Sequence, residues 1–115
     1  MTDKTTAILE KMMDVASFRQ KILASNIANV ETPGYKAKDI SFQKELNAAI
    51  EGSSNKKQGY EVFETTPTMI NRDGNTVNID TEMARVAENT LLHNTSAQLL
   101  AMNFRMIKDI IRGGR

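Results

Sequence analysis

Cysteine and tryptophan are absent from this chain of 115 residues, and aromatic residues make up only 5% of it. Without cysteine the chain can form no disulfide framework, no thiolate zinc site and no cysteine nucleophile. The scarcity of aromatic side chains argues against a large aromatic core, whereas the seven methionines suit adaptable contacts between helices.

Long apolar runs are also missing. The longest is Leu99–Met102, far below the roughly 20 residues that a membrane-spanning helix needs. The N-terminus carries no apolar core of a signal peptide. We therefore expect a chain that does not span a membrane and is not exported with a cleaved signal.

The chain has no excess of either charge. Fifteen Lys and Arg balance fourteen Asp and Glu, which leaves a net charge of +1. This charge lacks the basic field of a nucleic-acid binder, so no nucleic-acid partner is expected. The length and the share of apolar residues, 40%, fit one folded unit.

A first long helix is predicted over residues 5–30, where apolar residues recur at helical spacing. The stripe consists of Leu9, Met12, Ala16, Leu23, Ile27 and Val30. Proline disfavours helical geometry in the residue before it, and Thr32-Pro33-Gly34 is typical of a turn. The helix should therefore end near Val30 or Glu31.

A second long helix is predicted from residue 80, with Asp80 as its cap and Gly113-Gly114 at its end. Its apolar positions alternate steps of three and four for about four heptads. We call this set the heptad stripe: Met83, Val86, Thr90, His93, Ala97, Leu100, Phe104, Ile107 and Ile111. A second flank, on another face, comprises Leu92, Leu99, Met102, Met106 and Ile110.

The segment between the two helices has little periodicity. Phe42, Leu46, Ala49 and Ile50 suggest a short amphipathic helix. Short strands are predicted at 60–62 and 77–79, with a turn at Asp73-Gly74 and a polar linker over 52–59. Such a segment is either a small accessory unit or is ordered only by a partner.

The helices are too long for a compact globule. At 1.5 Å per residue they would measure about 40 and 46 Å, whereas a globule of this length is only about 35 Å across. We therefore expect a mainly α, elongated fold in which the terminal helices pack as a coiled-coil-like hairpin or bundle. It divides into an N-terminal helix (1–32), a middle segment (33–79) with possible short strands, and a C-terminal helix (80–115).

Because one copy cannot cover both stripes, we expect them to form an assembly seam with other copies. Its members are Leu9, Met12, Leu23, Ile27, Met83, Val86, Ala97, Leu100, Phe104, Ile107 and Ile111.

Catalytic and metal sites have little support in the sequence. The single histidine, His93, lies on the heptad stripe and reads as an interface residue. Residues 71–82 resemble a calcium loop, but Thr76 stands where that loop needs glycine. The basic residues Arg105, Lys108 and Arg112 suit a helix C-terminus. We expect no enzyme activity, no catalytic residues, no cofactor and no metal.

Residues 24–37 are harder to explain by composition alone. Asn26 and Asn29 share a helix face just before the predicted end of the helix, where their amides could tie the departing loop to the helix. The segment resembles the signature of the bacterial flagellar axial proteins, the rod and hook family. The matching residues, called the family motif here, are Ser25, Asn26, Ile27, Ala28, Asn29, Thr32, Pro33, Gly34 and Tyr35.

The resemblance extends beyond this motif. Residues 36–42 and the stretch Asp73–Val77, which leads into the second helix, look like those of the short proximal-rod members of the family. The resemblance implies a structural subunit of the flagellar basal-body rod, located on the periplasmic side and present in the cytoplasm before export. It also implies export by the flagellar type III apparatus and transmission of torque from the membrane ring to the hook.

The partners implied by the resemblance are other copies of the chain, related rod proteins, membrane-ring and rod-base adaptor proteins, and the export apparatus. Two alternatives remain at this point. One is a different short rod protein of the same family. The other is a cytoplasmic helical adaptor or export chaperone, which would use the same apolar faces on a transient partner.

Overall fold

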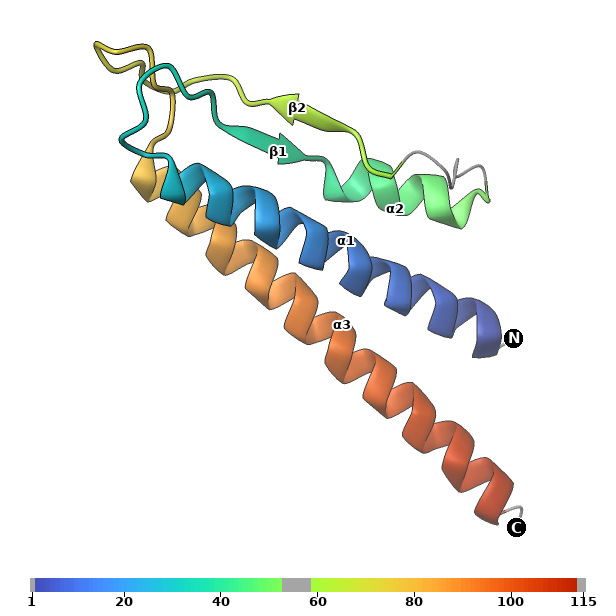
Figure 1. The fold of residues 1–115 in the computed structure, drawn as a ribbon. Helices are drawn as coiled ribbons and strands as arrows, with labels where there is room; N and C mark the ends of the chain where they lie inside the picture. The colour runs from blue at the N-terminus through green and yellow to red at the C-terminus, as the bar shows by residue number, and fades with distance from the viewer. Residues whose placement is uncertain (1, 53–58, 114–115) are drawn as a thin grey trace.

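The structure is a computed structural model that describes residues 2–52 and 59–113. Its elements, in chain order, are α1 (Thr2–Ala28), β1 (Lys38–Ile40), α2 (Phe42–Ile50), β2 (Val62–Glu64) and α3 (Ile79–Gly113) (Figure 1). The molecule measures 67 × 27 × 17 Å, with a radius of gyration of 17.8 Å. The predicted mainly α, elongated fold with two long terminal helices and a small β-containing middle is therefore confirmed.

The two long helices lie side by side and run antiparallel, so both termini are at the same end of the molecule (Figure 1). From α1, the apolar side chains of Leu9, Ala16 and Leu23 are buried. On α3, the fully buried side chains are polar and recur every seven residues. Together with Asn103, which bonds to Thr6 on α1, they form the polar line: Glu82, Asn89, Ser96 and Asn103.

The apolar residues of α3 lie on either side of the polar line. At about 100° per residue, the heptad stripe falls on one side and the second flank on the other. Within the heptad stripe, Phe104 is 51% and Ile111 76% exposed, and in the second flank Met106 is 58% and Ile110 69% exposed. One copy of the chain thus leaves much of both apolar faces in solvent.

The middle segment packs on α1. The predicted short helix is confirmed as α2, whose N-cap Ser41 accepts a hydrogen bond from the backbone N–H of Lys44 at 3.2 Å. The ring of Tyr60 lies 5.0 Å from that of Phe18 on α1. Of the predicted linker over 52–59, residues 53–58 lie outside the described residues.

The predicted strands need correction. The first is shifted to β2 and pairs antiparallel with β1, with Lys38 opposite Glu64 and Ile40 opposite Val62. Residues 77–79 form no strand. Val77 is buried in the loop before α3, where its N–H donates to Asn75 Oδ1 at 2.7 Å. Its alternation with polar neighbours therefore reflects burial in that loop, not membership of a sheet.

The predicted helix ends shift by up to three residues, since α1 begins at Thr2 instead of residue 5. The N-cap of α3 is Asn78 instead of Asp80, because Asn78 Oδ1 accepts hydrogen bonds from the backbone N–H groups of Asp80 (3.0 Å) and Thr81 (3.4 Å). At the same end of the helix pair, α1 stops at Ala28 and continues as a turn, in which Val30 N donates to Ile27 O. Across the described ranges, no helix is both long and apolar enough to cross a bilayer.

Candidate functional site

The family motif lies at the end of α1, where the chain enters the middle segment. Tyr35 N donates to Thr32 O at 3.2 Å, and Gly34 has φ +76°. Pro33 at the second turn position and a glycine with positive φ at the third are typical of a type II turn. Thr32 Oγ1 also donates to Asn29 Oδ1 at 2.9 Å, which anchors the turn to the end of α1.

Asn26 joins three segments from a fully buried position. Its Nδ2 donates to Lys38 O (2.8 Å) and to Glu82 Oε1 on α3 (2.9 Å), and its Oδ1 accepts from Lys38 N (3.0 Å). Asn29 closes the helix end by donating to Ser25 O at 2.8 Å. The predicted role of these amides in tying the loop to the helix is confirmed.

Asn75 reaches the same turn from the loop before α3. Its buried Nδ2 donates to Asn29 O (2.9 Å) and Thr32 O (2.7 Å), carbonyls that no longer have helical partners. The predicted turn at Asp73-Gly74 is present, with Gly74 N donating to Asn71 O at 2.9 Å. A Cβ on Gly74, whose φ is +86°, would lie 3.7 Å from Gly34 Cα, so the two turns pack together.

We call this region the junction: the end of α1, residues 29–37, residues 71–78 and the first turns of α3. In Figure 1 it forms the end of the molecule away from the termini. Within it, Ser25 and Ala28 are exposed, Ile27 is half-buried, and Ser25 Oγ lies 3.2 Å from the Tyr35 hydroxyl. Thr76 N donates to Tyr35 O at 3.0 Å, which joins the loop before α3 to the family motif.

A buried charge cluster adjoins the junction. Arg19 Nε and Nη2 donate to the two carboxylate oxygens of Asp39 at 2.8 and 3.0 Å, and Arg19 Nη1 donates to Glu88 Oε1 at 3.3 Å. Arg85 Nη1 donates to Glu82 Oε2 at 2.9 Å. Burial alone lowers the pKa of Arg19, but the hydrogen bonds and charge of Asp39 outweigh it and raise that pKa above its ordinary value.

Sequence reasoning did not single out Arg19 as a site residue. A signal existed, because Arg19 lies on the same helical face as Ala16, Leu23 and Asn26, at steps of three and four. A charged residue within an otherwise apolar stripe indicates a buried partner. That partner, Asp39, follows a region without periodicity and could not be identified from spacing.

The polar line was also missed. Its central member, Asn89, is 1% exposed and donates to Ala16 O (2.8 Å) and Gln20 Oε1 (2.9 Å) across the helix pair. Its Oδ1 has no hydrogen-bond partner in the described part of the chain. Beside it lies a shallow groove of about 200 Å³, whose lining includes Ser17 and His93.

The residues of the predicted assembly seam differ in exposure. Leu9 and Leu23 are buried under α3, and Met12 and Ile27 are half-buried. The half-buried seam residues on α3 are Val86, Ala97, Leu100 and Ile107. The exposed ones are Met83, Phe104 and Ile111.

The chemistry of these sites is structural. The side-chain amides of Asn29 and Asn75 donate to carbonyls at the end of α1, and an arginine–carboxylate pair holds α1 to the strand β1. Exposed apolar faces like those of α3 are typical of an interaction surface.

Comparisons with known proteins agree with this arrangement. Residues 13–36, which include the family motif, match the family described as flagella basal body rod protein. The chain is 30% identical to the flagellar basal body rod protein FlgB of Bacillus subtilis, over 93% of this chain and 92% of that protein. It is 30% identical to FlgB of Borrelia hermsii over 91% of this chain and 93% of that protein. It is 28% identical to FlgB of Salmonella typhimurium over 99% of both.

Proposed function

The chain belongs to the FlgB family of flagellar basal body rod proteins and is a structural subunit of that rod; from this premise we propose how it works there. The apolar faces of α3 on both sides of the polar line are covered by other rod subunits, and torque passes from the membrane ring to the hook through these contacts. The alternatives of a cytoplasmic adaptor or export chaperone have no observation in their favour.

The observation that carries this proposal is the exposure of α3. Leu99, Met102, Phe104 and Met106 are each between 44% and 58% exposed. Fully burying such a side chain contributes about 1.5 to 3 kcal/mol, so covering its exposed half contributes roughly 1 kcal/mol. Because each copy offers many such side chains, a stiff assembly can arise from repeated contacts that are individually modest.

The junction has a different role in the proposal. Asn26, Asn75 and the Arg19–Asp39 pair hold α1, the middle segment and α3 in one arrangement within each copy. Such a fixed arrangement lets load applied to the middle segment reach the terminal helices. On this view the two terminal segments, 1–32 and 80–115, form the inner helices of the rod. The middle segment, 33–79, makes the outward contacts.

Partners and route are proposed as follows. The chain contacts copies of itself and FlgC-like rod proteins along the terminal helices, and FliF-like ring and FliE-like adaptor proteins at the base of the rod. It leaves the cytoplasm through the flagellar type III export apparatus and joins the rod on the periplasmic side. Export as a chain without its neighbours suits faces that stay uncovered until assembly.

Purification of basal bodies tests the proposal. The protein should co-purify with intact basal bodies and cross-link to rod and ring proteins there. Recovery only in the cytosolic fraction, bound to an exported protein, would refute it and favour the adaptor.

A further inference from the structure

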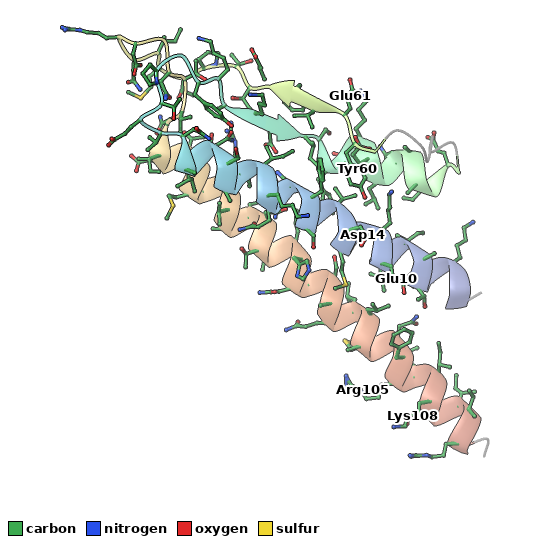
Figure 2. The ribbon with its side chains drawn as sticks, in the orientation of Figure 1. Glu10, Asp14, Tyr60, Glu61, Arg105 and Lys108 are labelled. Atoms are coloured by element: carbon green, nitrogen blue, oxygen red, sulfur yellow. The ribbon has the colours of Figure 1, made fainter. Side chains whose placement is uncertain are left out.

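Two pairs of exposed side chains, one acidic and one basic, lie on different helices. On α1, Glu10 and Asp14 are exposed and lie one turn apart, and on the last turns of α3, Arg105 and Lys108 are exposed and lie one turn apart (Figure 2). Arg112, also exposed, continues the basic face, which the exposed Asp109 borders. Lys11, which lies between Glu10 and Asp14 in the sequence, is half-buried and places its ammonium over the Tyr60 ring. In the ranges that the structure describes, none of these charged side chains takes part in an ion pair.

These faces cannot meet within one copy, because both point away from the contact between α1 and α3. At 100° per residue, Glu10 and Asp14 lie about 120° and 160° around α1 from the buried Ala16. Arg105 and Lys108 lie about 160° and 140° around α3 from Asn103, which bonds to α1. Each charged face is therefore open to a second molecule.

The end of α3 also extends past α1. From the bond between Asn103 and Thr6, α3 continues for ten residues to Gly113, whereas α1 continues only four residues back to Thr2. The difference corresponds to about 9 Å of helix without α1 beside it. The exposed Phe104 and Ile111, about 40° and 60° around α3 from Lys108, supply apolar surface beside the basic side chains.

We propose that the end of α3 in one copy docks along the outer face of α1 in a second copy, with Arg105 and Lys108 opposite Glu10 and Asp14. This inference rests on the proposed function and specifies one of its contacts. The charges fix the register of one copy on the next, and the exposed apolar side chains at the end of α3 flank this contact. A contact between two different patches of identical chains either closes into a ring or repeats into an open helix. A rod requires the open helix.

The overall charge of the chain permits this arrangement. With a net charge of +1, copies do not repel one another strongly, so local charge decides how they align. If the two faces were only solvated, reversing their charges would leave assembly unchanged.

A charge-reversal experiment in cells tests the pairing. The variants are Glu10→Lys/Asp14→Lys, Arg105→Glu/Lys108→Glu and the combination of all four, each replacing the wild-type protein in a motile strain. Each double variant should lower the amount of protein recovered in purified basal bodies about tenfold, because like charges then face each other. The combination, which keeps the net charge at +1, should restore wild-type recovery and swimming.

The matched control is Glu51→Lys/Glu64→Lys. It makes the same change in net charge at exposed carboxylates of the middle segment and should assemble normally. Circular dichroism of the purified variants checks that each keeps wild-type helicity. A double variant that unfolds is replaced by its neutral form, Glu10→Gln/Asp14→Asn or Arg105→Gln/Lys108→Gln.

Two results would overturn the pairing: wild-type recovery of either double variant, or a combination no better than the doubles. Neither result would touch the proposed function. That function fails only if the wild-type protein is itself absent from basal bodies.

Discussion

At the junction, polar side chains are buried and bonded, whereas along the last turns of α3 apolar side chains are exposed. Asn26 and Asn75 are 0% exposed and each makes three hydrogen bonds of 3.0 Å or less. Ile110 and Ile111 are 69% and 76% exposed. Both ends of the helix pair depart from the usual distribution of side chains. Polar side chains are buried at one end, and apolar side chains are exposed at the other.

This contrast separates two tasks. Hydrogen bonds depend on direction, so the junction can hold one arrangement of α1, β1 and α3 without help from neighbours. Apolar burial has no direction and needs a partner surface. The junction therefore specifies the shape of one copy, and the end of α3 depends on the assembly.

The largest effect is expected at the apolar end. Phe104→Asp should abolish incorporation into the rod while lowering the unfolding midpoint of the isolated chain less than Leu23→Asp does, because the Phe104 ring is 51% exposed in one copy and Leu23 is fully buried. Leu100→Asp should act in the same way on assembly. Motility and basal-body recovery measure the effect, with the exposed Gln98→Asp as a control that adds the same charge. Wild-type swimming by Phe104→Asp would contradict the proposed role of this face.

The next largest effect is expected at the junction, on the stability of one copy. Arg19→Met should lower the free energy of unfolding by about 3 kcal/mol, because it leaves the carboxylate of Asp39 buried without its main partner. Urea unfolding followed by circular dichroism measures the loss. Lys21→Met, an exposed position on the same helix, is the control. Equal stability of the two variants would show that the pair does not hold α1 to β1.

A smaller effect distinguishes two asparagines of the motif. Asn26→Ala should cost about 2 kcal/mol, because it leaves buried groups of Lys38 and Glu82 without a partner. Asn29→Ala, at a half-buried position, should cost about 1 kcal/mol or less. The same urea titrations compare them, and assembly at raised temperature should follow the same order. Equal losses would contradict the assignment of Asn26 as the central bond of the junction.

The smallest effect is a pH dependence of the middle segment. Lys44 Nζ lies 2.8 Å from Glu61 Oε1, and this hydrogen bond and charge lower the pKa of Glu61. Because the folded pKa is below the unfolded one, the stabilisation is present above about pH 4.3 and is lost as the pH falls through the folded pKa. NMR titration of the Tyr60 region should show this transition, and Glu61→Gln should remove it. An unchanged titration in Glu61→Gln would contradict the pairing.

The parts that the sequence predicted depend on local signals. Both long helices follow from the spacing of their apolar residues, and the turn at Thr32-Pro33-Gly34 follows from the backbone preferences of proline and glycine. Asn26 and Asn29 stood out because amides at the end of a helix have an evident task. These signals need no knowledge of what lies opposite in the fold.

The parts that the sequence did not predict depend on distant partners. The strand β1 exists because Lys38–Ile40 pairs with Val62–Glu64, and three residues are too few to show alternation. Both Asn78 and Asp80 are good N-caps by residue type, and only the hydrogen bonds from Asp80 N and Thr81 N to Asn78 Oδ1 identify the one that is used. The polar line looks like an ordinary solvent-exposed face until the position of α1 is known.

The most direct test of the central claim is the reactivity of a cysteine introduced at position 106. The chain contains no other cysteine, so only this side chain would react with a thiol reagent. Met106→Cys should react rapidly with a thiol reagent in the dilute, isolated protein and slowly in purified basal bodies, while Leu23→Cys, at a fully buried position, is protected in both. Equal reactivity of Met106→Cys in the two states, or its protection in the isolated protein, would contradict the claim that other subunits cover this face of α3.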